Sequence, residues 1–205
     1  MQSSLIPFLV AALAAAAVWV GYAIAEARAR RRLAALERAF RGYATEHGLT
    51  VVPFVDVAGA SPGAGPPLVR GELQGVALEL TVHPSARSLT CVEAPLPGVS
   101  NGFVLQIRKR TRRLPRAFEG HPITEAPTGN KAFDAAFALL SNEPDLARSL
   151  VDRRLAQVVL GFPRVFVDLY ACDNRLLLAW RGMETDRMVL EAAVEVVFTA
   201  CRRRA

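Results

Sequence analysis

The sequence predicts an α+β protein, in which an N-terminal transmembrane helix is followed by an antiparallel-sheet domain with helices packed mainly on one face. Two features carry this prediction. An uncharged, apolar run covers Leu5–Ile24, and short segments with apolar residues at alternate positions follow it, separated by tight turns. Such short, adjacent strands are typical of an antiparallel sheet, whereas a βαβ array alternates strands with helices. The 205 residues leave room for one such domain and an appendage.

The apolar run Leu5–Ile24 is long enough to cross a membrane. Its twenty residues form a helix about 30 Å long, which matches the hydrocarbon core of a bilayer. The alternative is a cleaved signal peptide, because Ala23-Ile24-Ala25 has the small-x-small pattern of a cleavage site. The run is longer than a typical signal-peptide core, and no basic side chain precedes it. We therefore predict a retained anchor over residues 1–25.

Arginine sets the predicted orientation of the chain. Six arginines follow the apolar run closely: Arg28, Arg30, Arg31, Arg32, Arg38 and Arg41. By the positive-inside rule, the larger C-terminal part then faces the cytoplasm. Three separated cysteines without a CxxC pair are typical of a reducing compartment, and the excess of Arg over Lys, 23 against 2, suggests a GC-rich bacterial genome. The predicted location is the bacterial inner (cell) membrane, as a single-pass protein.

Residues 26–48 are predicted to form a juxtamembrane helix that continues the anchor and ends at the C-cap Gly48. One apolar stripe recurs along it at helical spacing: Leu33, Leu36, Phe40, Tyr43 and His47. Such a stripe either docks on the chain's own domain or forms a homodimer through residues 33–47. Fewer than three heptads are present, which favours docking over a coiled coil.

Residues 49–205 are predicted to be the cytoplasmic domain, either as one body or as two units, 49–109 and 131–205, joined by a basic loop. Alternating patterns predict strands over 51–57, 68–74, 76–83, 88–94, 102–109, 164–171 and 175–181. Pro53 suggests an edge position for the first strand, and Cys172-Asp173-Asn174 a hairpin turn. Helices are predicted over 143–160, capped by Asn142, and over 186–202, capped by Thr185.

A resemblance supports this architecture. The stretch Thr128-Gly129-Asn130-Lys131-Ala132-Phe133-Asp134-Ala135-Ala136-Phe137, with Asn142-Glu143-Pro144 and Ala147 after it, resembles the TG-x-x-x-FD-x-x-F pattern of uncharacterised, membrane-anchored bacterial proteins assigned to domains of unknown function. The upstream Gly71-Glu72-Leu73-Gln74-Gly75-Val76 is similar to a strand pair in those proteins. Asn130 stands where they usually have an acidic residue. The resemblance implies a short anchor plus an α+β cytoplasmic module, and no known activity.

Within that stretch, the residue types indicate structural roles. Phe133 and Phe137, at i and i+4, are expected to be core anchors, and Asp134 to cap or pair locally.

A basic loop is the strongest candidate for a functional surface. Six cations fall within nine residues: Arg108, Lys109, Arg110, Arg112, Arg113 and Arg116. Together with Arg30, Arg31 and Arg32 they are the predicted contacts to an anionic surface. Each basic residue near an anionic leaflet contributes about 1 kcal/mol, so the hypothesis is that the loop holds the domain against lipid or an acidic protein partner. A loop that is merely solvated is the equal alternative. Nucleic-acid binding is not expected, because neither stacking aromatics nor a groove-reading helix accompanies the loop.

No catalytic, cofactor or metal site is predicted. His47, His83 and His121 are isolated in the sequence, without HxxxH or HExxH spacing. The hypothesis that Cys91 is a nucleophile beside His83 is weaker than the hypothesis that Cys91 is packed in the core. The expected function is a membrane-tethered interaction or scaffold module, with a membrane-bound enzyme or ligand sensor as the alternative.

Overall fold

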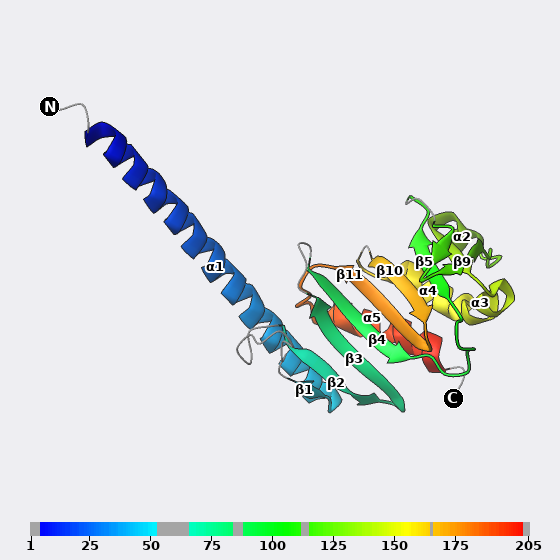
Figure 1. The fold of residues 1–205 in the computed structure, drawn as a ribbon. Coiled ribbons are helices and arrows are strands. Elements are labelled where there is room, and N and C mark those ends of the chain that lie inside the picture. The colour runs from blue at the N-terminus through cyan, green and yellow to red at the C-terminus, as the bar shows by residue number, and fades with distance from the viewer. Residues whose placement is uncertain (1–4, 53–65, 84–87, 112–114, 165, 203–205) are drawn as a thin grey trace.

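The computed structural model describes residues 5–52, 66–83, 88–111, 115–164 and 166–202, with side chains from Ala14 onward except Phe166 and Val167. The helices in this part of the chain (Figure 1) are α1 (Leu5–His47), α2 (Lys131–Ala136), α3 (Pro144–Leu150), α4 (Arg153–Gly161) and α5 (Arg187–Cys201). The strands are β1 (Thr50–Val52), β2 (Leu68–Leu73), β3 (Val76–His83), β4 (Leu89–Pro95), β5 (Leu105–Lys109), β6 (Ala117–Phe118), β7 (His121–Pro122), β8 (Thr124–Glu125), β9 (Phe137–Ser141), β10 (Phe166–Cys172) and β11 (Arg175–Arg181).

The predicted anchor and juxtamembrane helix form one continuous helix, α1, of 43 residues. Its N-terminal half projects away from the domain, and its C-terminal part lies against the sheet (Figure 1). The helix ends at Gly48, whose φ of 67° is the left-handed conformation of a C-cap glycine. Among the residues whose side chains are described, which in α1 begin at Ala14, no helix has a stretch long and apolar enough to span a membrane.

The apolar stripe of α1 docks on the domain of the same chain. Leu36 and Phe40 are 0% exposed and Tyr43 is 2% exposed, and all three belong to the main core. The turn after α1 is also tightly packed, because a Cβ on Gly71 of β2 would lie 2.7 Å from Cδ2 of Leu49. A homodimer through residues 33–47 stays a prediction.

Within the described residues, nine strands form one antiparallel sheet, in the order β1-β2-β3-β4-β11-β10-β5-β9-β8. This confirms the predicted α+β class with an antiparallel sheet. The two-residue turns Gln74-Gly75 and Asp173-Asn174 all have positive φ, between 50° and 83°. That geometry is typical of type I′ hairpins, whose twist matches the twist of the strands they join.

The two units considered from the sequence do not form separate bodies. β4 pairs with β11 over seven positions, and β5 lies between β10 and β9. Strands from residues 49–109 and from residues 131–205 therefore alternate in the interior of one sheet, where β4 pairs with β11 and β5 with β10.

The helices pack mainly on one face of the sheet. The larger core cluster joins the inward-facing side chains of the strands to buried residues from all five described helices. A smaller cluster on the opposite face contains Val104, Ile123, Ala138 and Leu140, with no helical residue. Alternation along the strands explains the division, since Leu139 of β9 belongs to the larger cluster and its neighbours Ala138 and Leu140 to the smaller one.

The helices in the second half of the chain depart from the prediction in three places. The single helix predicted over 143–160 is two helices, α3 and α4, and Asp152 caps the second by accepting a hydrogen bond from the Leu155 N–H. Asn142 bonds Val104 and Gly102 of the neighbouring loop instead of capping α3. The final helix begins one residue later than predicted, after Asp186.

Strand β9 was not predicted at all. Its five residues are all buried, and a short, continuous apolar run has the same appearance in a strand as in a buried helix. Residues 53–57 of the first predicted strand, and Arg112 and Arg113 of the basic loop, lie outside the described residues.

Candidate functional site

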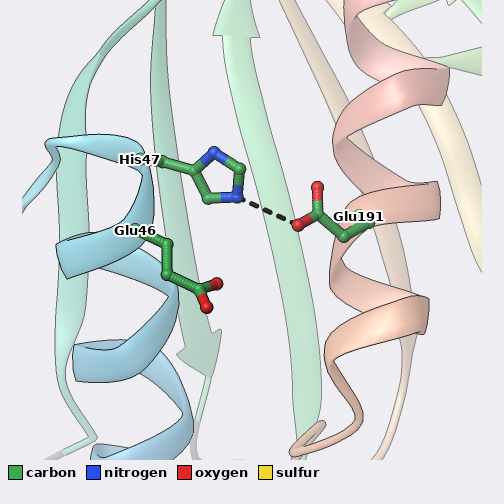
Figure 2. Close-up of side chains that lie close together, drawn as sticks. All are labelled: Glu46, His47 and Glu191. Atoms are coloured by element: carbon green, nitrogen blue, oxygen red, sulfur yellow. Dashed lines mark hydrogen bonds and ion pairs between the residues drawn. The ribbon is translucent and has the colours of Figure 1, made fainter.

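The last turn of α1 and the first half of α5 meet in a cluster of ionisable side chains (Figure 2). Glu46 and His47 come from α1, and Glu191 comes from α5. Nε2 of His47 lies 3.0 Å from Oε1 of Glu191. One ligand-type atom from each of these three residues lies within 4.8 Å of the other two. We name these three side chains, together with Arg187, the α1–α5 clamp.

Arg187 bridges the two carboxylates of the clamp. Its Nη1 lies 2.8 Å from Oε1 of Glu46, and its Nε lies 3.6 Å from Oε1 of Glu191. The ring of Tyr43 packs on His47, with 4.4 Å between ring centroids. The buried Tyr43 hydroxyl has no hydrogen-bond partner among the described residues. Burial, and then the charge of Glu191, raises its pKa, so the phenol stays protonated.

The clamp offers metal ligands, but its geometry favours an ionic contact. An imidazole nitrogen and two carboxylates are groups that zinc accepts in proteins. The guanidinium of Arg187 already contacts both carboxylates and neutralises the charge that would attract a cation. The arrangement therefore holds the end of α1 against α5. Sequence reasoning missed it, because Glu191 is 144 positions from His47 and no local spacing joins them.

Two cations of the predicted basic loop are paired with other groups of the same chain. Arg108 lies 3.6 Å from Asp168 of β10. Arg110 donates to Glu125 and to the Asp134 carbonyl. These contacts arise because β5 is an interior strand of the sheet, so the cations at its end meet acidic side chains of the neighbouring elements.

The remaining loop cations differ in exposure. Lys109 is half-buried at the end of β5, and Arg116 is exposed; neither side chain has a hydrogen bond or ion pair in the part of the chain that is described. Arg112 and Arg113 are outside that part. The loop thus presents fewer free charges than its sequence suggests.

The three juxtamembrane candidates lie on α1. Arg30 pairs with Glu26 one turn earlier. Arg31 and Arg32 are exposed and have no acidic partner among the described residues.

Glu184 is the most heavily bonded carboxylate in the described structure, and its side chain is 8% exposed. It accepts hydrogen bonds from Trp180 Nε1, from Arg164, and from the backbone N–H groups of Thr185 and Asp186. Burial raises its pKa, but the bonds from Arg164, Asp186 and Trp180 outweigh burial and lower it below the ordinary value. This group joins β11 to the start of α5 and is fully occupied with structural contacts.

The cysteines are free, and two of the three are buried. Burial raises the pKa of Cys91 to about 11, with a smaller contribution from Glu93, and raises that of Cys201 to about 12. Cys172 is half-buried, and its pKa is also raised, first by burial. A protonated, buried thiol is a poor nucleophile.

We expect alkylation of the folded full-length protein at pH 8 to modify Cys172 alone. Cys91 and Cys201 will react only after unfolding, because the reagent reaches neither thiol in the folded state. Intact mass measurement after brief treatment with iodoacetamide, with and without denaturant, will count the modified thiols. A Cys172→Ser variant is the control and should show no adduct when folded. Rapid modification of Cys91 in the folded protein would instead restore it as a candidate nucleophile.

The TG-x-x-x-FD stretch is a compact cap of α2. Asp134 accepts hydrogen bonds from the backbone N–H and hydroxyl of Thr128 and from the Gly129 N–H. Asn130 is the N-cap and accepts from the N–H groups of Ala132 and Phe133. The predicted local role of Asp134 is confirmed. Phe133 and Phe137 are both buried in the core, as predicted, although Phe137 begins β9 instead of continuing the helix.

Comparisons with known proteins identify the fold but not a family. No protein-family model matches the chain, and no curated protein matches it. Among solved structures, the chain is similar to the crystal structure of the mycobacterial trehalose monomycolate transport factor A, TtfA. The TM-score is 0.59 and the identity 17%, and the match covers 82% of this chain and 94% of that one. At this identity the likeness shows a shared fold alone.

Proposed function

We propose that this chain is a single-pass membrane protein whose C-terminal domain is an interaction or scaffold module on the cytoplasmic face of a bacterial cell membrane. One observation carries the membrane part of the proposal. Five large apolar side chains are exposed together near the middle of α1: Val18, Trp19, Val20, Tyr22 and Ile24. Exposure of that many apolar groups in water is unfavourable, whereas lipid and the headgroup zone favour them.

The flanking sequence supports the same arrangement. The exposed group continues the uncharged run that starts at Leu5, and arginines begin at Arg28. Because α1 is continuous, the membrane segment is joined rigidly to the core through Phe40 and its neighbours. The domain is therefore held at a defined distance and orientation, which suits a docking module. The sheet face opposite the helices, where no described helix packs, is the surface available to a partner.

Fractionation of cells that express the full chain tests the anchor. We expect the protein in the pellet after alkaline carbonate extraction, with an intact N-terminus and a C-terminal reporter active only in the cytoplasm. The double variant Leu13→Arg/Val18→Arg should leave the pellet, because each arginine near the helix centre costs about 2.5–3.5 kcal/mol of insertion.

A matched control places the same two charges elsewhere. Leu160 and Met188 are exposed on the domain, so Leu160→Arg/Met188→Arg should leave the protein in the pellet. A soluble, exported protein that starts at Glu26 would overturn the proposal, since the run would then be a cleaved signal.

A further inference from the structure

A cleft of about 500 Å³ lies between α1 and the segment that joins β11 to α5. We name it the juxtamembrane cleft. Its polar lining is formed by Arg32, Ser88, Arg181 and Thr185, and Met183 supplies an apolar wall. A smaller cavity of about 140 Å³ shares Thr185 with it and runs beside Arg38 and Arg187. Space remains there because α1 presents the small residues Ala35, Ala39 and Gly42 to the two cavities.

The cleft is positively charged without an internal counter-ion. Within the described structure, neither the Arg32 side chain nor the Arg181 side chain has a hydrogen bond or ion pair. Nearby arginines differ in this respect, since Arg164 pairs with Glu184 and Arg187 with Glu46. Two unpaired guanidinium groups from two elements, with two hydroxyls beside them, form a set of donors that suits a phosphate group.

The position of the cleft along α1 relates it to the membrane, an argument that rests on the proposed anchor. Arg32 follows Ile24 by eight residues, which is about 12 Å along the helix axis. The polar zone outside the hydrocarbon core is about 5–8 Å thick, and helical side chains point toward the N-terminus. The guanidinium of Arg32 therefore reaches back toward the headgroup phosphates.

The basic loop is less well placed for the same role. β5 is five positions from β2 in the sheet order, which is about 24 Å at the usual strand spacing. α1 contacts β1 and β2, so the end of β5 lies across the sheet from the helix. Its Arg108 and Arg110 are also engaged by acidic partners or carbonyl oxygens.

We propose that the juxtamembrane cleft binds the phosphate group of an anionic phospholipid. Arg32 and Arg181 hold the phosphate from opposite walls, the hydroxyls of Ser88 and Thr185 complete the polar contacts, and Met183 lies against the apolar part of the lipid. A bound lipid then bridges α1 and the β11–α5 segment. The lipid composition of the leaflet therefore affects how firmly the domain is held against α1.

Lipid retention by the full-length protein tests this site. The protein in neutral detergent is mixed with equal amounts of phosphatidylglycerol and phosphatidylcholine, and retained lipids are counted by native mass spectrometry. We expect phosphatidylglycerol to be retained preferentially. Arg181→Gln and Arg32→Gln should each reduce that retention roughly fivefold to tenfold, because each removes a charge-assisted contact. Arg153→Gln is the matched control, since Arg153 is exposed on α4 and unpaired among the described residues, and it should change nothing.

A second arm separates a lipid site from a soluble-anion site. Inorganic phosphate is titrated into the same lipid-free preparation and followed by ³¹P line broadening. Binding of free phosphate that depends on Arg181, without preference for phosphatidylglycerol, would overturn the lipid assignment. Equal retention of both lipids would also overturn it. The same holds if Arg153→Gln reduces phosphatidylglycerol retention as much as Arg32→Gln and Arg181→Gln do. Carbonate extraction of the same variants keeps the outcomes distinct: a protein that stays in the pellet without lipid preference refutes the cleft alone, and one that leaves the pellet refutes the anchor.

Discussion

Replacing Phe40 by alanine is expected to lower the free energy of unfolding by about 3–5 kcal/mol. Phe40 of α1 is fully buried and belongs to the main core. Its removal leaves a cavity where α1 docks, and neighbouring backbone on a sheet and a long helix has little freedom to fill it. The substitution therefore weakens the packing that joins the proposed membrane segment to the domain.

The measurement is equilibrium urea unfolding of the full-length protein in detergent, followed by circular dichroism. Arg38→Ala is the matched control on the same helix, because Arg38 is exposed and its side chain makes a single bond, to the Ala34 carbonyl. We expect its effect to stay within about 0.5 kcal/mol. If Phe40→Ala were as mild as the control, α1 would not be docked on the domain.

Replacing Glu184 by alanine is expected to cost about 3 kcal/mol. The substitution leaves the buried indole N–H of Trp180 without its acceptor and removes the acceptor of two N–H groups at the start of α5. It also frees Arg164 from its ion pair, but Arg164 is half exposed and contributes less. Glu195→Gln is a control, since Glu195 pairs with Arg154 at the surface. A loss as small as that of the control would mean that Glu184 is not a structural anchor.

The pH dependence of stability follows from the same contacts. The folded-state pKa of Glu184 is lowered, so the unfolded chain binds the proton more readily. The carboxylate therefore adds stability at pH values above the ordinary Glu pKa of about 4.3, and this stability is lost as the pH falls through the lower, folded-state pKa. Glu184→Gln should be less stable than the wild type at pH 7 and should lose less stability between pH 5 and pH 3. Parallel curves for the two proteins would contradict this assignment.

Local patterns predicted most of the individual elements. The two hairpins at Gln74-Gly75 and Asp173-Asn174 were readable because type I′ turns need residues that tolerate positive φ. The stripe from Leu36 to Tyr43 was readable because helical periodicity marks a buried face. Strand β9 and the break between α3 and α4 could not be read from the sequence. A short apolar run and a helix cap at Asp152 have no hydrophobic periodicity that distinguishes a strand from a helix.

Sites formed by segments distant in the chain could not be predicted from the sequence. The basic loop stood out as a local cluster of charge, yet Arg108 meets Asp168 only because β5 and β10 are neighbours in the sheet. Arg181 had no apparent role until the fold placed it across a cleft from Arg32. The α1–α5 clamp was hidden for the same reason, since its members are joined by packing.

By itself, the sequence determined the antiparallel α+β class, the long N-terminal helix and the turn positions, because each depends on residues within one or two turns of one another. The tertiary structure alone decided which arginines are neutralised, which carboxylate is buried, and where free positive charge faces a cavity. Those outcomes depend on strand order and helix docking, which bring together side chains as distant in the sequence as Arg32 and Arg181, or His47 and Glu191.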